Sequence, residues 1–317
     1  FPDHGFTRML QQYPRYLLDE LLQDTGSGHR VLATVYVECR AMYRQGGPAA
    51  LRCVGETEFA NGVAAMAASG IYGTTQACAA IVAHADLRAG AVVEEVLQAH
   101  LAAGGGRLRG IRDSASWVPD PQVKGPSSSH ASEGLLLDAQ FRQGFALLHR
   151  LGLVFEAWLF EPQLPDLIDL ARSHPETTIV LNHVGGPVGL GMYQGMREQR
   201  FDIWRDNIQA LARCDNVVVK LGGLGMPYPG FDWGPERPAT QSAELAQAWR
   251  PWIDTCIQAF GPQRCMFESN FPVDGYSCSY RLLWNAFKRL ASGYTDAEQD
   301  QIFFGTAKRV YRIDVEP

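Results

Sequence analysis

Short apolar runs alternate with longer amphipathic segments along almost the whole chain. Apolar side chains recur at helical spacing in the longer segments, which predicts helices over 15–24, 54–69, 90–103, 138–150, 164–173, 201–213 and 242–260. Between them lie short runs rich in β-branched and other apolar residues, which predict strands over 31–37, 77–83, 108–111, 153–160, 177–181, 216–221 and 265–267. Strands that alternate with helices and are buried on both faces indicate a parallel sheet with right-handed crossovers.

This order predicts an α/β fold, a (β/α)8 TIM barrel that forms a single domain over residues 1–317. The pattern supplies seven strands where such a barrel has eight, so we expect a first strand upstream of Phe1, or one absent from this sequence. An open doubly wound sheet is the competing architecture. It is disfavoured because no early strand is followed by a glycine-rich turn.

Polar residues gather where the predicted strands end. The run 264–274 is the clearest case: three apolar residues lead directly into Glu268, Ser269 and Asn270, and Asp274 follows. In a parallel α/β barrel the catalytic groups lie at the carboxyl ends of the strands. The same ending recurs on earlier strands, with Glu38, His84, Arg112, Asp113, Glu161 and His183. The sequence therefore predicts one site built from several strand ends.

These strand ends resemble the amidohydrolase-2 family, and within it the branch of sugar-lactone and 2-pyrone-4,6-dicarboxylate lactonases. The resemblance is carried, in order, by 36–44 (YVECRAMYR), 110–114 (GIRDS), 161–164 (EPQL), 181–186 (LNHVGG) and 265–273 (CMFESNFPV). It implies a barrel with its site at the strand carboxyl ends, and hydrolysis, commonly of lactones. Decarboxylases and other lyases are relatives of the same fold.

Several positions depart from the family pattern. Relatives carry a His-x-His pair on the first strand, which has no counterpart in this sequence. Asp113 and Glu161 stand where relatives often have histidine, and Asn270 stands where they usually have aspartate. His183 remains as an imidazole at a matching position and is the candidate metal ligand. The pattern leaves a zinc or manganese ion open and favours a metal-free site.

The candidate catalytic residues are His183, Asp113, Glu161 and Asn270. A histidine titrates near neutrality and suits general acid–base work, and two carboxyl groups can form an acid–base pair when their surroundings separate their pKa values. The alternative for Asp113 and Glu161 is a structural ion pair with Arg112 or Lys220. Asn270 cannot act as a base, but its amide can hydrogen bond to a substrate oxygen.

The candidate substrate-binding residues fall into two kinds. Arg112 can hold a carboxylate or lactone oxygen through its planar fork, or can pair with Asp113 or Glu38. An inward Lys220 can polarise a carbonyl, or can belong to an ion pair inside the barrel. Other polar and aromatic side chains are expected to line the remaining site: Glu38, His84, Trp158, Tyr228 and Trp233. The alternative for His84 is a structural cap, and the alternative for Trp158, at a strand end, is a place in the core.

Composition narrows the functional class. Apolar residues make up 46% of the chain and the net charge is −6, with no basic block, which argues against nucleic acid and membrane surfaces as partners. Seven scattered cysteines without a CxxC pair suggest reduced thiols in a cytoplasmic protein. The prediction is a hydrolase acting on a small lactone-like or carboxylated compound, with a homodimer open. The alternatives are a decarboxylase or other lyase, and a barrel that has lost hydrolysis and binds a ligand.

Overall fold

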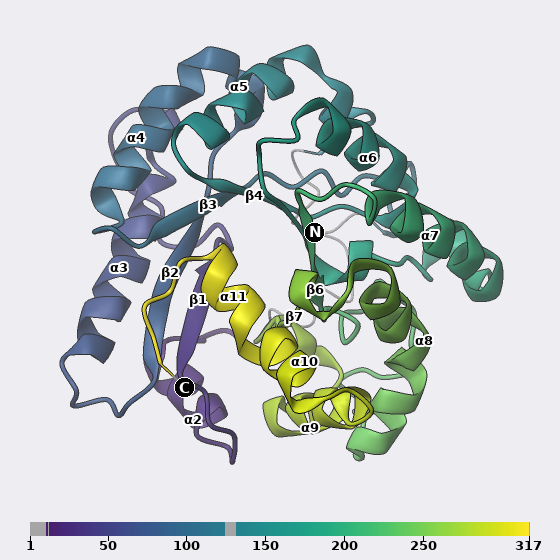
Figure 1. Cartoon of the computed structure of the whole chain (residues 1–317). Coiled ribbons are helices and arrows are strands. Elements are labelled where there is room, and N and C mark those ends of the chain that lie inside the picture. The colour runs from purple at the N-terminus through teal and green to yellow at the C-terminus, as the bar shows by residue number, and fades with distance from the viewer. Residues whose placement is uncertain (1–10, 12, 124–130, 317) are drawn as a thin grey trace.

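A single curled sheet organises the computed structural model, which describes residues 11, 13–123 and 131–316 (Figure 1). Its seven strands pair side by side in chain order, and every pairing is parallel. The strands are β1 (Ala33–Val37), β2 (Gln76–His84), β3 (Leu108–Arg112), β4 (Val154–Ala157), β5 (Ile179–Leu181), β6 (Val217–Leu221) and β7 (Cys265–Phe267). The predicted parallel α/β architecture is confirmed.

The helices of the described residues are α2 (Leu18–Thr25), α3 (Val54–Ala68), α4 (Glu94–Ala103), α5 (Ala139–Arg150), α6 (Leu164–Ser173), α7 (Arg197–Leu211), α8 (Ser242–Phe260), α9 (Tyr280–Ala291), α10 (Asp296–Asp300) and α11 (Thr306–Val310). Those from α3 to α8 cover the outer face of the sheet (Figure 1), whereas α11 packs toward its interior through Ala307 and Val310. In α6, for example, Leu164, Leu167, Ile168 and Ala171 recur at helical spacing and are buried. Within the described part of the chain, none of these helices is both long and apolar enough to cross a membrane.

Most predicted elements match the structure to within a few residues at their ends, and for two of them the difference has an identifiable local cause. The helix expected over 90–103 begins as the 3-10 segment η2 (Leu87–Val93), because Gly90 has a positive φ that interrupts the helix, and continues as α4. The strand expected over 153–160 is confined to β4, because the chain turns at Glu161–Gln163 (η5), where Pro162 supports a turn. Of the loop expected over 116–133, residues 124–130 lie outside the described part of the chain.

The interior of the curled sheet holds a separate core. Side chains alternate along each strand, so Val154, Val180, Val218 and Met266 face inward while their sequence neighbours pack under the helices. Tyr311 and Ile313, from the segment after α11, join this inner cluster and are almost fully buried. The C-terminal segment thus packs into the sheet interior, and β1 contributes Val35 and Val37 at its edge (Figure 1).

Candidate active site

A polar layer lies above the inner apolar cluster. On each of β4 to β7 the inward apolar residue is followed two positions later by a polar one, which the alternation of strand side chains turns to the same face. These pairs are Val154 and Glu156, Val180 and Asn182, Val218 and Lys220, and Met266 and Glu268. The layer therefore sits at the carboxyl ends of the strands, where the sequence predicts the site.

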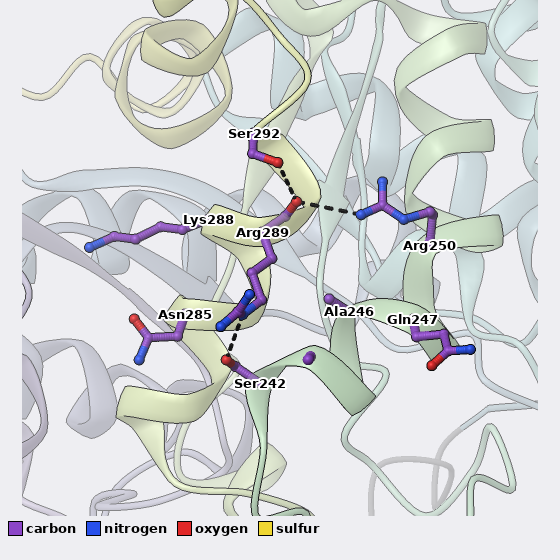
Figure 2. Close-up of a pocket in the computed structure, with 9 residues that line it drawn as sticks. Ser242, Ala246, Gln247, Arg250, Asn285, Lys288, Arg289 and Ser292 are labelled. Carbon is purple, nitrogen blue, oxygen red and sulfur yellow. Dashed lines mark hydrogen bonds between the residues drawn. The ribbon is translucent and has the colours of Figure 1, made fainter.

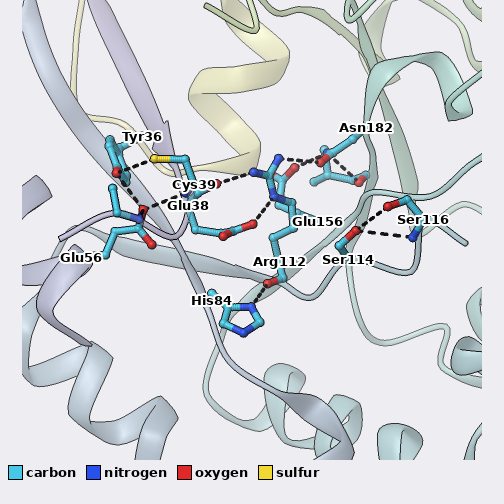
Figure 3. Close-up of polar contacts among 12 residues, drawn as sticks. Tyr36, Glu38, Cys39, Glu56, His84, Arg112, Ser114, Ser116, Glu156 and Asn182 are labelled. Atoms are coloured by element: carbon cyan, nitrogen blue, oxygen red, sulfur yellow. Dashed lines mark hydrogen bonds and ion pairs between the residues drawn. The ribbon is translucent and has the colours of Figure 1, made fainter. Parts of the chain in front are cut away.

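Arg112, at the end of β3, is held by residues that follow β1 and β5, each two strands away in the sheet (Figure 3). Its Nε donates to Oε1 of Glu38 at 2.7 Å, and a terminal nitrogen donates to the Glu38 carbonyl oxygen. Its other terminal nitrogen lies 3.5 Å from Oδ1 of Asn182. Burial acts to raise the pKa of Glu38, but the charge and hydrogen bond of Arg112, together with the charges of His84 and Arg40, hold that pKa below its usual value. Glu38 is thus an ionised partner for Arg112.

Lys220 and Glu156 form a buried ion pair at the centre of the layer. Nζ of Lys220 lies 2.8 Å from Oε2 of Glu156, and Glu156 is fully buried. The same carboxyl group accepts hydrogen bonds from Nδ2 of Asn182 and from the hydroxyl of Tyr311. Nζ of Lys220 also lies 3.8 Å from Oε2 of Glu268. This arrangement corresponds to the barrel-interior ion pair that the sequence left open for Lys220.

His183, after β5, and Glu268, after β7, form a second pair across the end of β6. Nδ1 of His183 lies 2.6 Å from Oε1 of Glu268, and the His183 main-chain N–H donates to the same oxygen at 3.1 Å. Burial acts to raise the pKa of Glu268, but His183 and Lys220 together lower it below its usual value. Because an ionised carboxylate only accepts, Nδ1 carries the proton, and Nε2 of the neutral ring is left as an acceptor. The pair can therefore serve as a general base.

The backbone around His183 is strained. His183 and Val184 have φ values of 53° and 48°, in the left-handed region that β-branched residues rarely adopt. Trp158 packs against the imidazole, with the ring centroids 4.7 Å apart. On the far side, a Cβ built on Gly223, which has φ 72°, would lie 2.5 Å from Cβ of His183. Strain of this kind gathers at functional sites, where the surroundings hold one geometry.

The Gly223→Ala substitution is therefore expected to displace His183. We expect the substitution to destabilise the fold by about 1–3 kcal/mol, because alanine is strained at this positive φ. We also expect it to lower turnover more than a substitution that introduces the same backbone strain away from His183. Gly134→Ala is the matched control, because Gly134 has φ 65° and open space around its Cβ position. Urea unfolding and turnover would be measured for both. Equal effects of the two variants on turnover would contradict the close fit of Gly223 to His183.

Asp113 and Glu161 are held away from this network. Oδ2 of Asp113 accepts from the Leu87 main-chain N–H at 3.0 Å, and burial raises the pKa of Asp113 to about 6. Glu161 forms a two-point ion pair with Arg200 of α7. Burial raises the pKa of Glu161 even so. The partners expected for these carboxyl groups, Arg112 and Lys220, are instead engaged by Glu38 and Glu156.

Asn270 is fixed by a carboxyl group four residues further on. Its Nδ2 donates to Oδ1 of Asp274 at 2.7 Å, and its backbone has φ 50°. Oδ2 of Asp274 accepts from the Gly225 main-chain N–H at 3.3 Å. Because the amide nitrogen is turned to Asp274, Oδ1 is the atom of Asn270 that can accept from a substrate hydroxyl.

The other predicted binding residues take different places. Trp158 lies against His183, whereas Tyr228 is buried behind it, packed on Phe160 and Trp158. Trp233 packs against Trp249 at 6.2 Å, under the helices. His84 hydrogen bonds through Nδ1 to the Arg112 carbonyl oxygen at 3.1 Å, so it supports the strand end that carries the guanidinium (Figure 3).

The described side chains do not fit a metal ion. Among them, no three His, Cys, Asp or Glu groups are placed to share one cation. Nδ1 of His183 is directed to Glu268, and the second oxygen of Glu268 faces the Lys220 ammonium, which would repel a metal. Of the seven cysteines, all free, Cys39 is exposed and the other six are buried. The catalytic chemistry is therefore derived from His183, Glu268 and Lys220 themselves.

A surface groove of about 760 Å³ lies elsewhere, between α8 and α9 (Figure 2). Arg250, Lys288 and Arg289 line it together with small polar residues, and Arg289 is held by Ser242 through a 2.9 Å hydrogen bond. None of the predicted site residues lines this groove. The polar layer at the strand ends is therefore the better candidate for catalysis.

Comparison with known proteins identifies the class. The amidohydrolase family profile matches residues 22–313, and the chain belongs to that family. An L-fucono-1,5-lactonase of Burkholderia multivorans is 31% identical over 236 residues, which cover 74% of this chain and 72% of that protein. An uncharacterized protein, y4mH, of Sinorhizobium fredii is 31% identical over 301 residues, 94% of this chain and 86% of its own length.

Solved structures agree with this assignment. A crystal structure of an amidohydrolase from Burkholderia multivorans with bound zinc superposes with a TM-score of 0.72 at 28% identity, covering 94% of this chain and 89% of that one. A putative 2-pyrone-4,6-dicarboxylic acid hydrolase of Pseudomonas putida matches with a TM-score of 0.61 at 16% identity over 98% of this chain and 95% of that one, which supports the barrel fold alone. The predicted TIM-barrel fold and lactonase-like branch are confirmed, and the protein is a hydrolase of this family.

Three central residues were not among the predicted site residues. Glu156 and Glu268 follow inward apolar residues at a spacing of two, and this signal alone would have placed both in the polar layer. Tyr311 gives no such signal, because it reaches Glu156 from 155 positions further along the chain.

Proposed function

We propose that the protein hydrolyses the ring ester of a neutral, hydroxylated lactone. The observation that carries this proposal is the His183–Glu268 pair, an oriented imidazole at the strand ends of an amidohydrolase barrel. The similarity to an L-fucono-1,5-lactonase supports a lactone as the substrate class. The finer choice, neutral rather than carboxylated, follows from the charges of the site.

Both cations of the polar layer already have carboxylate partners. Arg112 is paired with Glu38, and Lys220 with Glu156 and, at longer range, Glu268. Three carboxyl groups thus face two cations, so a carboxylated substrate would meet surplus negative charge. Like charges brought together in a buried site cost several kcal/mol. Carboxylates and the Asn270 Oδ1 instead suit substrate hydroxyl groups, which donate.

In the proposed reaction the neutral His183 ring removes a proton from water at Nε2. The water oxygen forms a bond to the lactone carbonyl carbon, and the ring C–O bond then breaks. The leaving alkoxide takes the proton from His183, which yields a hydroxy acid and restores the neutral ring. Glu268 stabilises the transient imidazolium through Nδ1, and Lys220 keeps Glu268 ionised.

A substrate panel tests the proposal. Five- and six-membered aldonolactones would be compared with 2-pyrone-4,6-dicarboxylate by pH-indicator assay, with carbon dioxide release followed in parallel. We expect kcat/KM for the best neutral lactone to exceed that for the dicarboxylate by roughly 100-fold, as a like-charge cost of this size implies. Preference for the dicarboxylate, release of carbon dioxide, or ligand binding without any turnover would each contradict the proposal.

A further inference from the structure

The C-terminal segment reaches the centre of the polar layer from inside the barrel. The hydroxyl of Tyr311, directly after α11, donates to Oε1 of Glu156, while Oε2 of Glu156 contacts Lys220. Tyr311 is 1% exposed and its ring lies in the inner apolar cluster. The phenol ring therefore packs in the inner apolar cluster, and its hydroxyl group hydrogen bonds to Glu156 of the ion pair.

The segment that carries Tyr311 is itself tied to the strands. Nε of Arg109, on β3, donates to the Tyr311 carbonyl oxygen at 2.7 Å, and Arg312 donates to the Gly152 carbonyl oxygen at 2.9 Å, just before β4. The Tyr311 carbonyl group and the side chain of the next residue are thus tied to β3, which carries Arg112, and to the segment that leads into β4, which carries Glu156. The hydroxyl has little freedom to leave Glu156.

A buried ion pair of this kind needs further hydrogen bonds, because desolvation of two charges can exceed their mutual attraction. Oε1 of Glu156 has Tyr311 as its donor, and Oε2 has Lys220 and Asn182. Burial and the neighbouring carboxylate raise the pKa of Tyr311 well above its usual value, so the phenol remains a donor. The ring also lies 5.7 Å from Nζ of Lys220, within reach of a cation–π contact.

We propose that Tyr311 is a positioning residue through which the C-terminal segment fixes the Glu156–Lys220 ion pair beneath the catalytic base. This inference rests on the proposed function in one respect: the Glu156–Lys220 ion pair matters for catalysis because Lys220 keeps Glu268 ionised beside His183. Direct contacts connect Tyr311 to Glu156, Glu156 to Lys220, and Lys220 to Glu268.

The ¹³C chemical shift of Lys220 Cε reports this coupling without any substrate, because it responds to the position of the Glu156 carboxylate beside Nζ. The sequence has four lysines, Lys124, Lys220, Lys288 and Lys308, so the Cε resonances of ¹³C-lysine can be assigned with Lys220→Arg. Other charged or titratable groups face the pair from every surrounding element, and they are unchanged in the variants below: Arg112 from β3, His183 after β5, and Glu268 after β7.

Tyr311→Phe removes the hydroxyl and keeps the ring, so the core remains filled. We expect the Lys220 Cε resonance, measured at one fixed pH, to shift and broaden, because Glu156 loses the hydrogen bond that holds it in place against Lys220. Glu156→Gln should shift the resonance further, and adding Tyr311→Phe to Glu156→Gln should change it no more. Tyr16→Phe, which removes a 2.7 Å tyrosine–carboxylate bond to Asp24, is the matched control and should leave it unchanged.

Two results would overturn the proposal. One is a Lys220 Cε chemical shift in Tyr311→Phe equal to that of the unsubstituted protein. The other is an additional shift when Tyr311→Phe is combined with Glu156→Gln, which would mean that the phenol acts on Lys220 by a route other than Glu156. Neither result depends on lactone turnover, so failure of this proposal is distinct from failure of the proposed function.

Discussion

His183→Gln is expected to lower kcat on the best lactone by roughly 10³-fold, with a much smaller change in KM. Glutamine keeps similar volume and can still hydrogen bond to Glu268, but it has no basic nitrogen at neutral pH. A positioned general base contributes about 10² to 10⁴ in rate. The loss should therefore fall on the chemical step, and steady-state kinetics across the substrate panel would measure it.

Glu268→Gln separates the role of the His183 imidazole as a base from the role of the Glu268 charge in stabilising the imidazolium. The amide retains the shape of Glu268 but presents no charge to the imidazolium, so we expect a loss of about 10²-fold in kcat. An amide nitrogen turned toward Nδ1 would also oppose the tautomer that leaves Nε2 as the acceptor. The smaller loss than in His183→Gln is itself part of the prediction, since the imidazole remains.

The chain offers a matched control for both variants. Nδ1 of His174, directly after α6, lies 3.4 Å from Oε1 of Glu176, so this is another histidine–glutamate pair, positioned before β5 rather than after it. His174→Gln and Glu176→Gln should leave kcat unchanged. A loss smaller than about threefold in His183→Gln would remove His183 from the reaction, because a general base contributes far more than that.

The sheet and most helices could be predicted because their signals are local. Periodicities of 3.6 and two residues depend on near neighbours, and α8 (Ser242–Phe260) matches its predicted range in full. Element boundaries failed where one residue decides the local backbone, as Gly90 does at the start of α4. Strand ends also predicted the place of the site, because parallel strands bring their carboxyl ends to one edge.

Local sequence patterns did not decide which carboxyl group of the site pairs with which donor. Asp113 and Glu161 follow strands just as His183 does, yet Leu87 and Arg200 capture them. Which carboxyl group meets which donor depends on contacts between segments far apart in sequence. Glu268, two residues before Asn270 and on the same strand end, supplies the carboxylate that contacts His183. The resemblance drew attention to Asn270, whereas in the structure Glu268 is the residue that contacts His183.

Asp274→Asn is expected to remove a large pH dependence of stability. Asp274 is fully buried, and burial raises its pKa from 3.8 to about 8, with Glu268 adding to the effect. The folded protein then holds a proton that the unfolded chain has released. The stability that Asp274 contributes is therefore fully present below about pH 4 and is lost as the pH rises through about 8. At 1.36 kcal/mol per pH unit, this loss has an upper bound of roughly 6 kcal/mol.

Urea unfolding between pH 5 and 9 would measure this difference. The free energy of unfolding of the unsubstituted protein should fall more steeply with pH than that of Asp274→Asn, because asparagine has no proton to lose in this range. Asp19→Asn is the control, since that side chain is 66% exposed on α2 and should leave the slope unchanged. Parallel curves for Asp274→Asn and the unsubstituted protein would mean that Asp274 is ionised in the folded state. Asn270 would then be held by a buried carboxylate, and its Nδ2 would be oriented by charge rather than by a neutral acid.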